Sequence, residues 1–541
     1  MQFPTLATHL GIPGHDHRWG DYSVEGSEAE AHTHRDHLRR LDEADPATDR
    51  WSRLADQVVR QAIEDQLTQL DAGDHLRDLN SLASTLQDLR DIFDHMDTTT
   101  SDGWSNIAAR LTALPEAAAQ YRGRLEEGRR QGLVVARRQV TEAARQARNH
   151  AGNESFFVTL PDRMSAAGIT DGNLATHLDT GIAAARRAFG ELAVYLETDY
   201  MDSAVAEDAV GRERYVRAAS RFLGAELDPE RTYEWGWSEV DRLRGRMTEV
   251  AETIESGASL AEVLHLLQTD PARCTETAEE FRLLMQERQV TALAELEGTH
   301  FDVPEQVREV EVKLAPPGGS LGAYYVDPSE DYTRPGSVWW SLGHKEVVPL
   351  FDQVSTAYHE GFPGHHLQIS LQMTAGDRFS RYQKLLAWYP GTGEGWALYA
   401  EDLMEEWGYL EKPDYVMGKL AAEMLRATRV VIDIGSHLDL PIPDGQPFHP
   451  GERWSFDLGV EMLETLAAMD HETSVSEMNR YLGWPGQAIA YKVGQQAIRD
   501  LRDEAIAAEG VAFDAKAFHH RLLEVGSTGL DVLRSHMRDT G

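Results

Sequence analysis

The chain has 541 residues, 41% of them hydrophobic and 26% charged, which is typical of a soluble globular protein large enough for several lobes. Its 90 acidic and 52 basic residues give a formal net charge of −38, which argues against nucleic acids and anionic membranes as partners. Cys274 is the single cysteine, so an internal disulfide bond is excluded. No export signal is visible and no apolar run reaches the roughly 20 residues that cross a bilayer, so we expect a cytoplasmic protein.

Apolar residues recur at helical spacing through most of the first 300 residues, which predicts a mainly α-helical protein. Helices are expected over 51–70 and 76–96, after an irregular lead-in at 1–30. Asp228 followed by Pro229 is a typical helix start, with a capping side chain and a proline in the first turn. Further helices are expected at about 104–150 with an interruption at Pro115, 173–200, 205–224, 229–255 and 275–297.

The sequence pattern changes near residue 300, where short alternating segments predict strands. Val310–Leu314 alternates with period two before a Pro-Gly turn at 316–319, and Ala323–Val326 and Ser337–Ser341 follow. We expect a small antiparallel sheet near 307–342, either as a structural hairpin or with an exposed edge for an extended peptide. After it, helices are expected at about 350–374, 378–388, 393–407, 414–440, 456–470, 474–482, 485–506 and 515–538.

Three histidines and a glutamate fall within eight positions, at His359, Glu360, His365 and His366. Zinc hydrolases use such a set, because neutral imidazoles bind the cation and a carboxylate accepts a proton from water. The familiar motif has its two histidines four residues apart on one helix face, but here that position is Pro363. On a straight helix His366 would lie about 10 Å along the axis from His359, too far to share a metal. We therefore predict that Phe362-Pro363-Gly364 breaks the helix and brings His365 or His366 back toward His359.

A third metal ligand would have to come from another element, and the segment Gly393-Glu394-Gly395 is the best source. The flanking glycines would allow close backbone approach. Taken alone, Glu394 is a carboxylate favoured by the dipole at a helix start, but beside the histidine cluster we interpret it as a ligand. Glu401, on the same helical face, could orient a ligand by hydrogen bonding.

Four further polar residues lie on one face of a later helix, at Arg426, Arg429, Asp433 and His437. They form either a buried structural group or a set of side chains that contacts the substrate. Gln487 and Tyr491 are expected one turn apart in a helix that starts at Pro485. Tyr491 is either a packed aromatic residue or a donor to the oxyanion that forms when water attacks an amide.

In their order along the chain these motifs resemble the bacterial family catalogued as domain of unknown function 885. The resemblance covers about residues 30–540 and rests on His359–Gln368, Glu394–Tyr399, Arg426–His437 and Pro485–Gly494, with Gly211–Tyr215 and Tyr233–Gly236 in the first half. It implies a largely helical fold around a deep central channel with zinc at the bottom, like the thimet oligopeptidase, angiotensin-converting enzyme and carboxypeptidase Taq groups. Carried over to this chain, the resemblance makes His359 and Glu394 ligands and Glu360 the general base, and it favours His365 over His366.

We therefore expect a Zn²⁺-dependent hydrolase that cleaves peptide or related amide bonds of short substrates, with residues 1–300 as an N-terminal helical lobe and 301–541 as the catalytic lobe. Its expected metal ligands are His359, Glu394 and His365, with His366 as the alternative to His365. Its expected catalytic groups are Glu360, Tyr491 and Arg429, and the groups expected to support them or to contact substrate are Glu401, Arg426, Asp433, His437 and Gln487. Two alternatives are a metal-dependent amidohydrolase for a non-peptide small molecule and a non-catalytic helical scaffold with a structural histidine cluster. The substrate and the oligomeric state stay open, with a homodimer as one option.

Overall fold

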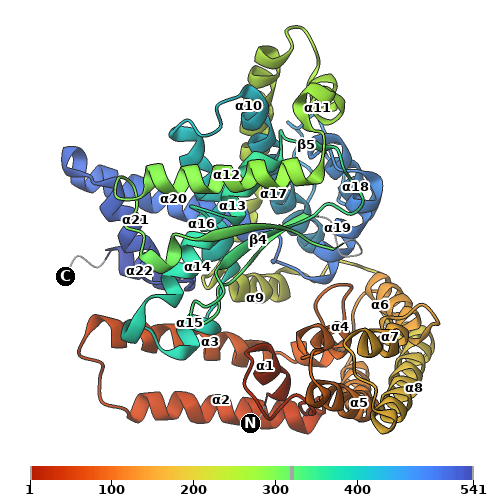
Figure 1. Cartoon of the computed structure of the whole chain (residues 1–541). Helices are drawn as coiled ribbons and strands as arrows, with labels where there is room; N and C mark the ends of the chain where they lie inside the picture. The colour runs from red at the N-terminus through yellow and green to blue at the C-terminus, as the bar shows by residue number, and fades with distance from the viewer. Residues whose placement is uncertain (1–2, 317–321, 539–541) are drawn as a thin grey trace. The chain divides into compact units, whose positions relative to one another are not determined.

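The computed structural model describes residues 3–316 and 322–538, and the protein is mainly α-helical, as predicted (Figure 1). The chain divides into two compact units: unit 1 comprises 1–44, 66–210 and 476–484, and unit 2 comprises 45–65, 211–475 and 485–541. The segment 211–300, expected in the N-terminal lobe, therefore belongs to unit 2 together with the histidine motif. Among the described residues, no helix combines the length and the apolar character needed to cross a bilayer.

Unit 1 has a helical core centred on the packing of α5 (Ser101–Arg130) against α8 (Gly172–Tyr195). Its largest buried side chains include Trp104, Tyr121 and Phe157, and burying each contributes about 1.5–3 kcal/mol or more to stability. Two helices, α3 (Arg50–Asp71) and α19 (His471–Gly483), have residues in both units. The other helices of unit 1 are α1 (Pro4–His9), α2 (Val24–Glu43), α4 (Thr85–Asp91), α5 (Ser101–Arg130), α6 (Arg137–Ala151), α7 (Leu160–Ala166) and α8 (Gly172–Tyr195).

The prediction of one continuous helix over 76–96 is wrong, because only α4 forms there between two short 3-10 turns. Asn80 interrupts the helix: its side-chain oxygen accepts hydrogen bonds from the N–H groups of Leu82 (2.8 Å) and Ala83 (2.7 Å). Such a local turn competes with helical hydrogen bonding. Ser84 then starts α4 through a reciprocal capping box with Gln87.

Pro115 does not interrupt α5, contrary to the sequence prediction. Proline removes one helical hydrogen bond and crowds the preceding turn. The helix continues through it because Leu111, Leu114 and Ala118 are all buried in the core of unit 1. The turn after α5 instead falls at Gly132, whose φ is +73°. The lead-in at 1–30 also holds more helix than expected, namely α1 and the start of α2.

Unit 2 carries the histidine motif and the strands. Its helix α10 begins as predicted, with the Asp228 carboxylate accepting the N–H of Arg231 (3.1 Å) and Pro229 in the first turn. The helices of unit 2 are α9 (Arg212–Leu223), α10 (Pro229–Ile254), α11 (Leu260–Thr269), α12 (Ala278–Leu296), α13 (Gln353–Glu360), α14 (His365–Met373), α15 (Arg381–Leu385), α16 (Pro390–Glu406), α17 (Pro413–Leu438), α18 (Phe456–Leu466), α20 (Ala490–Glu509), α21 (Ala515–Leu523) and α22 (Leu530–Arg538). Two short strands, β1 (Cys274–Thr275) and β5 (Val348–Pro349), pair with each other.

The three predicted strands form one sheet in the order β2 (Val310–Leu314), β4 (Gly336–Ser341) and β3 (Gly322–Val326). β3 and β4 are antiparallel, but β2 and β4 are parallel, so the expected antiparallel sheet is in fact mixed. The difference arises because β4, the most buried of the three strands, inserts between β2 and β3 after the chain has reversed direction. The turn expected at 316–319 falls mostly outside the described residues.

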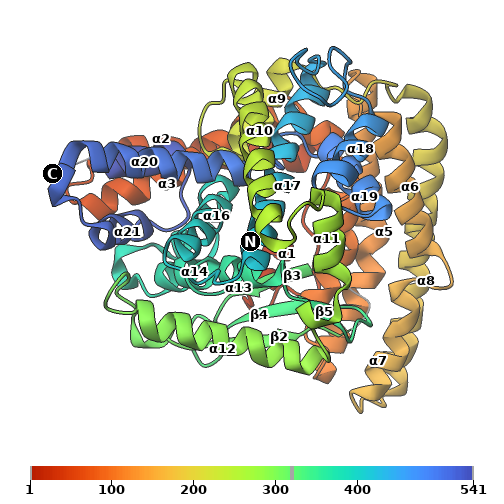
Figure 2. The ribbon, with the colours of Figure 1, turned by 90° about the horizontal axis from the view of Figure 1, so that it is seen from above.

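Helix α12 lies along one edge of this sheet. The side-chain amide of Gln286 donates to the carbonyl of Val310 (2.9 Å) and accepts the N–H of Val312 (2.8 Å), so it pairs with the outer edge of β2. Figure 2 shows α12 alongside β2, with β4 and β3 next and α13 further in. β3 thus lies at the other margin, beside the helix that carries His359.

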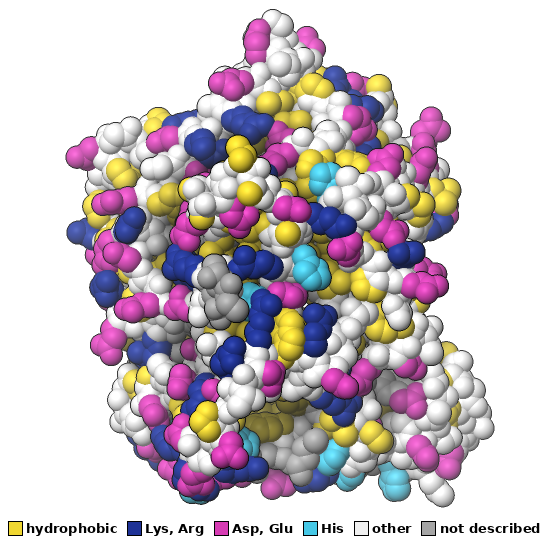
Figure 3. Space-filling view, turned by 90° about the vertical axis from the view of Figure 1, so that its left-hand side faces the viewer, with side chains coloured by type: hydrophobic (Ala, Val, Ile, Leu, Met, Phe, Trp, Pro, Cys, Tyr) yellow, Lys and Arg dark blue, Asp and Glu magenta, His cyan; other side chains and the backbone are white. Residues whose placement is uncertain are grey.

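Charged side chains of both signs are interspersed over the face shown in Figure 3. No single acidic region dominates that face. Acidic residues spread in this way keep many helix faces solvated.

Candidate metal centre

The helix that carries His359 ends where the sequence predicts a break. α13 stops before Gly361, and α14 begins at His365 after a turn with a cis Phe362–Pro363 peptide bond. Gly364 is needed in this turn, because a Cβ atom there would lie 2.0 Å from the carbonyl oxygen of His359. The two histidines therefore belong to consecutive helices, and their separation does not follow the pitch of one helix.

Two buried side chains from other helices hold the break. Gln289 of α12 donates its amide N–H to the carbonyl of Ala357 (2.7 Å) and accepts the N–H of Phe362 (2.7 Å). Trp396 of α16 donates its indole N–H to the carbonyl oxygens of Pro363 (2.9 Å) and Gly364 (3.2 Å). Backbone groups that the break removes from helical hydrogen bonding therefore find partners away from water.

Glu394 comes from α16, which packs closely on α20 and also contacts α13. A Cβ atom on Gly395 would lie 2.5 Å from the carbonyl carbon of Gly494, so the glycine beside Glu394 permits this close packing. Gly395 thus permits the close backbone approach expected of the flanking glycines, whereas Gly393 makes room for the side chain of Trp388.

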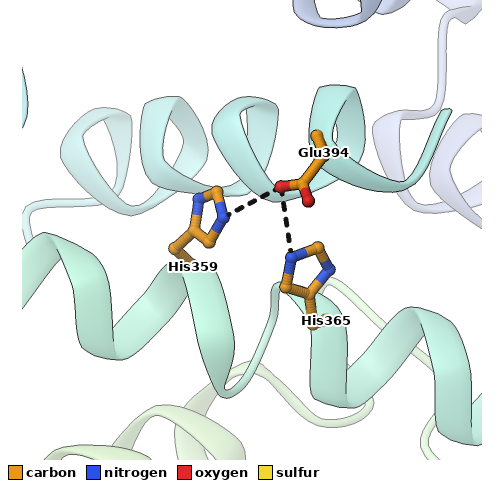
Figure 4. A group of neighbouring side chains, drawn as sticks. All are labelled: His359, His365 and Glu394. Carbon is orange, nitrogen blue, oxygen red and sulfur yellow. Dashed lines mark ion pairs between the residues drawn. The ribbon is translucent and has the colours of Figure 1, made fainter. Parts of the chain in front are cut away.

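The side chains of His359, His365 and Glu394 converge on one point (Figure 4). Glu394 Oε2 lies 3.4 Å from His359 Nε2 and 3.5 Å from His365 Nε2, and the three ligand atoms lie within 4.8 Å of one another. The two imidazole rings are 4.9 Å apart between centroids and nearly perpendicular. Two buried imidazoles and a carboxylate in this arrangement could hold a metal ion.

Glu401, further along α16, orients the ring of His359. Its Oε1 accepts a hydrogen bond from His359 Nδ1 (2.9 Å), and its Oε2 accepts one from the hydroxyl of Ser355. Burial alone would lower the pKa of His359, but Glu394 and Glu401 outweigh burial and raise that pKa to about 10. Burial opposes ionisation of Glu394, yet His359 and His365 hold its pKa far below the ordinary value. A bound cation would neutralise the same excess of negative charge around these histidines.

His366, the alternative ligand, points away from this cluster. Its Nε2 donates to the carbonyl of Val307 (2.8 Å), and its Nδ1 accepts from the hydroxyl of Tyr325 (3.0 Å). Burial lowers the pKa of His366 to about 4, so the ring is neutral near pH 7. His366 therefore ties β3 to α14, and His365 is the histidine that the structure brings to His359.

Glu360 directly follows His359 and is partly accessible to solvent. Burial raises the pKa of Glu360, and the positive charges of His359, His365 and Arg426 partly offset the rise. The carboxyl group is thus poorly solvated but still reachable. This environment suits a group that accepts and returns a proton near neutral pH.

Tyr491 lies beside two arginines of α17. The guanidinium carbons of Arg426 and Arg429 are 6.0 Å and 5.1 Å from the centroid of its ring. The positive charge of Arg426 also lowers the pKa of Glu360. The two arginines therefore connect Tyr491 to the surroundings of the histidine cluster. Gln487 lies in the turn before α20, so it does not share a helical face with Tyr491, because this helix begins later than the sequence predicted.

Asp433 and His437 of α17 are completely buried and contact other elements. The Asp433 carboxylate accepts hydrogen bonds from the hydroxyl of Tyr215 (2.7 Å) and from the N–H of Gly486 (2.9 Å). His437 Nε2 lies 3.6 Å from Asp433 Oδ1. Asp433 therefore joins α9 and the turn before α20 to α17, which is the structural one of the two roles considered for it.

Two residues near the cluster belong to no motif recognised in the sequence. Trp388, just before α16, has its ring centroid 5.8 Å from that of His365, and its side chain is 41% exposed. Asp327, just after β3, keeps contact with solvent, yet burial raises its pKa and the charge of His365 partly offsets the rise. Both approach the cluster only through the fold, so no spacing along the sequence could have identified them.

Comparison with known proteins agrees with the resemblance seen in the sequence. Two solved structures share the fold: a candidate lipoprotein from Colwellia psychrerythraea (TM-score 0.83, 22% identity, covering 99% of this chain and 95% of that one) and a candidate lipoprotein of unknown function from Shewanella oneidensis (TM-score 0.77, 15% identity, covering 99% and 96%). None of the curated proteins compared with the chain matches it. A family model described as bacterial protein of unknown function matches residues 4–537. Because this match spans nearly the whole chain, the protein belongs to that family, DUF885.

Proposed function

We propose that this protein is a zinc-dependent hydrolase that cleaves peptide or related amide bonds in short substrates. The observation that carries the proposal is the convergence of His359 Nε2, His365 Nε2 and Glu394 Oε2, with Glu360 next in the chain to the first of these ligands. Family membership supports the fold but assigns no chemistry. The proposal therefore rests on the site itself.

The two separations that involve Glu394 suit zinc. Two ligand atoms about 2.1 Å from an ion and at a tetrahedral angle are about 3.4 Å apart. The two separations from Glu394 Oε2 are 3.4 Å and 3.5 Å. Three protein ligands leave the fourth tetrahedral position for water. The hydrogen bond from His359 Nδ1 to Glu401 is the supporting contact typical of a zinc-bound histidine.

Each residue near the cluster then has a defined task. A zinc ion, when bound, would polarise the scissile carbonyl and lower the pKa of water toward about 7. Glu360 accepts the proton of the attacking water and passes it to the leaving nitrogen, a role favoured by its desolvated carboxyl group. The hydroxyl of Tyr491 donates to the developing oxyanion, and the neighbouring guanidinium of Arg429 adds positive charge on the same side.

A peptide is the substrate that the neighbouring sheet favours. β3 has a strand partner on one side only within the described residues, and it lies beside α13. An extended peptide could pair with the other edge of the strand, and β3 lies beside the helix that ends at Glu360. A non-peptide amide is the alternative, and it would not need this edge.

The experiment is metal analysis of the purified protein, together with cleavage assays on short peptides and on small non-peptide amides. We expect one zinc per chain, loss of zinc in His365→Ala, and loss of cleavage with retained zinc in Glu360→Gln. The exposed His344 provides a matched control, since His344→Ala should keep both zinc and activity. A Glu360→Gln variant that cleaves every substrate as the wild type does, or a wild-type protein without zinc, would refute the proposal.

A further inference from the structure

Trp388 contacts two of the three helices that carry the proposed zinc ligands. Its ring packs at 5.8 Å and a tilt of 57° to the ring of His365, the first residue of α14. It also lies against the first turn of α16, because a Cβ atom on Gly393 would be 2.3 Å from its six-membered ring. Gly393 immediately precedes Glu394, so the indole lies beside two of the three ligands.

The contact with Trp388 adds to two others that hold the ring of His365, namely the approach of its Nε2 atom to Glu394 (3.5 Å) and the edge contact with the ring of His359. The Nδ1 atom of His365 is buried and has no hydrogen-bond partner in the described part of the chain. His359, by contrast, is fixed through Glu401. One face of the indole thus has a packing role.

The rest of the indole faces solvent. Trp388 is 41% exposed, whereas His359 and His365 are 4% and 6% exposed. An indole buries a large apolar area when it is covered, so leaving it exposed forgoes stabilisation. Solvent also reaches the side chain of Glu394, which is 17% exposed, and part of Glu360. Water therefore reaches the indole and, at Glu394 and Glu360, also the cluster that the indole contacts.

We infer that Trp388 forms the wall of the proposed active site that receives a bulky apolar or aromatic side chain next to the scissile bond. This inference rests on the proposed function, because it assumes a metal held by His365 and Glu394. A side chain that covers the indole removes apolar surface of both partners from water, and aromatic rings gain further from edge or offset contacts. We expect a preference of about 10- to 100-fold for substrates or inhibitors with such a group over those with a methyl group.

Hydroxamates test the inference without turnover, because the hydroxamate group binds zinc and the attached group can be varied. Zinc-loaded wild-type protein, titrated by calorimetry, should bind phenylacetohydroxamate at least about tenfold more tightly than acetohydroxamate. Trp388→Ala should lose this preference while its affinity for acetohydroxamate changes little. Trp388→Phe should keep most of the preference. Trp51→Ala is the matched control, since Trp51 is a partly exposed tryptophan whose ring contacts are with Phe379, Arg50 and Arg378.

The outcomes separate this inference from the proposed function. A preference that survives in Trp388→Ala, or one that is absent from the zinc-loaded wild type, overturns the role of Trp388 and leaves the zinc site standing. A wild-type protein that binds no zinc overturns both. If the alanine variant does not retain zinc, Trp388→Leu keeps an apolar group against His365. In that variant the preference should fall to an intermediate value, and an unchanged preference would overturn the inference.

Discussion

Replacing Glu401 by glutamine should weaken zinc binding without touching a ligand atom. Glu401 is 3% exposed, and its carboxylate accepts the hydrogen bond from His359 Nδ1 at 2.9 Å. A hydrogen bond to a charged acceptor contributes about 1.5–3 kcal/mol, and one to a neutral acceptor about 0.5–1.5 kcal/mol. The difference of about 1–1.5 kcal/mol corresponds to a roughly tenfold weaker zinc affinity.

Glu401→Ala should have the larger effect. It leaves the Nδ1–H group of His359 buried without an acceptor, and the loss of such supporting contacts weakens metal binding by about 10- to 100-fold. Glu406→Gln is the matched control on the same helix, because Glu406 is 47% exposed and pairs with Arg502. Exposed ion pairs contribute little, so this variant should bind zinc as the wild type does.

The assay is competition for zinc against a chromophoric chelator at fixed pH, with circular dichroism to verify that each variant is folded. The order of zinc affinity should be wild type, then Glu401→Gln, then Glu401→Ala. A folded Glu401→Ala variant with wild-type affinity would show that His359 is not a ligand, or that its ring needs no such support. Equal weakening in Glu406→Gln would show that the effect is not specific to the contact with His359.

Three further predictions follow from residues around the cluster. His365→Ala should abolish stoichiometric zinc binding. His366→Gln should keep one zinc per chain but melt at a lower temperature, because His366 makes two buried hydrogen bonds. Metal analysis and thermal melting distinguish the two variants. Gly395→Ala should destabilise the fold by about 1–3 kcal/mol, since its methyl group would lie 2.5 Å from the backbone of α20. Gly245→Ala in α10 is the control: its methyl group would meet nothing within 4 Å, so it should stabilise the fold by about 0.5–1 kcal/mol. Urea denaturation measures both, and equal effects would refute the packing argument. Burial lowers the pKa of His519 to about 3. Below pH 6.5 the unfolded chain therefore takes up a proton that the folded chain does not, and the free energy of unfolding decreases as the pH is lowered. His519→Gln should therefore lose about 2 kcal/mol less unfolding free energy than the wild type between pH 7 and pH 5, and identical pH profiles would show that the ring is not held neutral.

Much of the fold could be predicted from local signals. The start of α10 follows from Asp228 and Pro229, and the strand at 310–314 follows from its alternation, because capping and side-chain period act over a few residues. The helix expected over 76–96 failed because the side chain of Asn80 competes locally with the backbone. The parallel pairing of β2 with β4 could not be predicted, since it depends on which strand inserts between the other two.

The candidate site shows the same division. The break after Glu360 was predictable from proline and glycine, and so was the supply of a carboxylate from the glycine-rich segment around Glu394. The choice between His365 and His366 depends on the geometry of a few linking residues, which spacing alone does not give. The contacts of Trp396 with the break and of Trp388 with His365 connect elements that are distant in sequence, so only the folded structure reveals them.

The break between α13 and α14 affects how a site of this kind can be recognised and adjusted. A sequence search for two histidines four residues apart would miss this chain, although its two imidazoles meet at a common carboxylate. Because each ring is mounted on its own helix, a slight sliding of one helix past the other changes the gap between the rings without unwinding either. Gln289 and Trp396 form hydrogen bonds with the residues that join the two helices. Substitutions at either position would thus change the distance between the two imidazoles without altering a ligand.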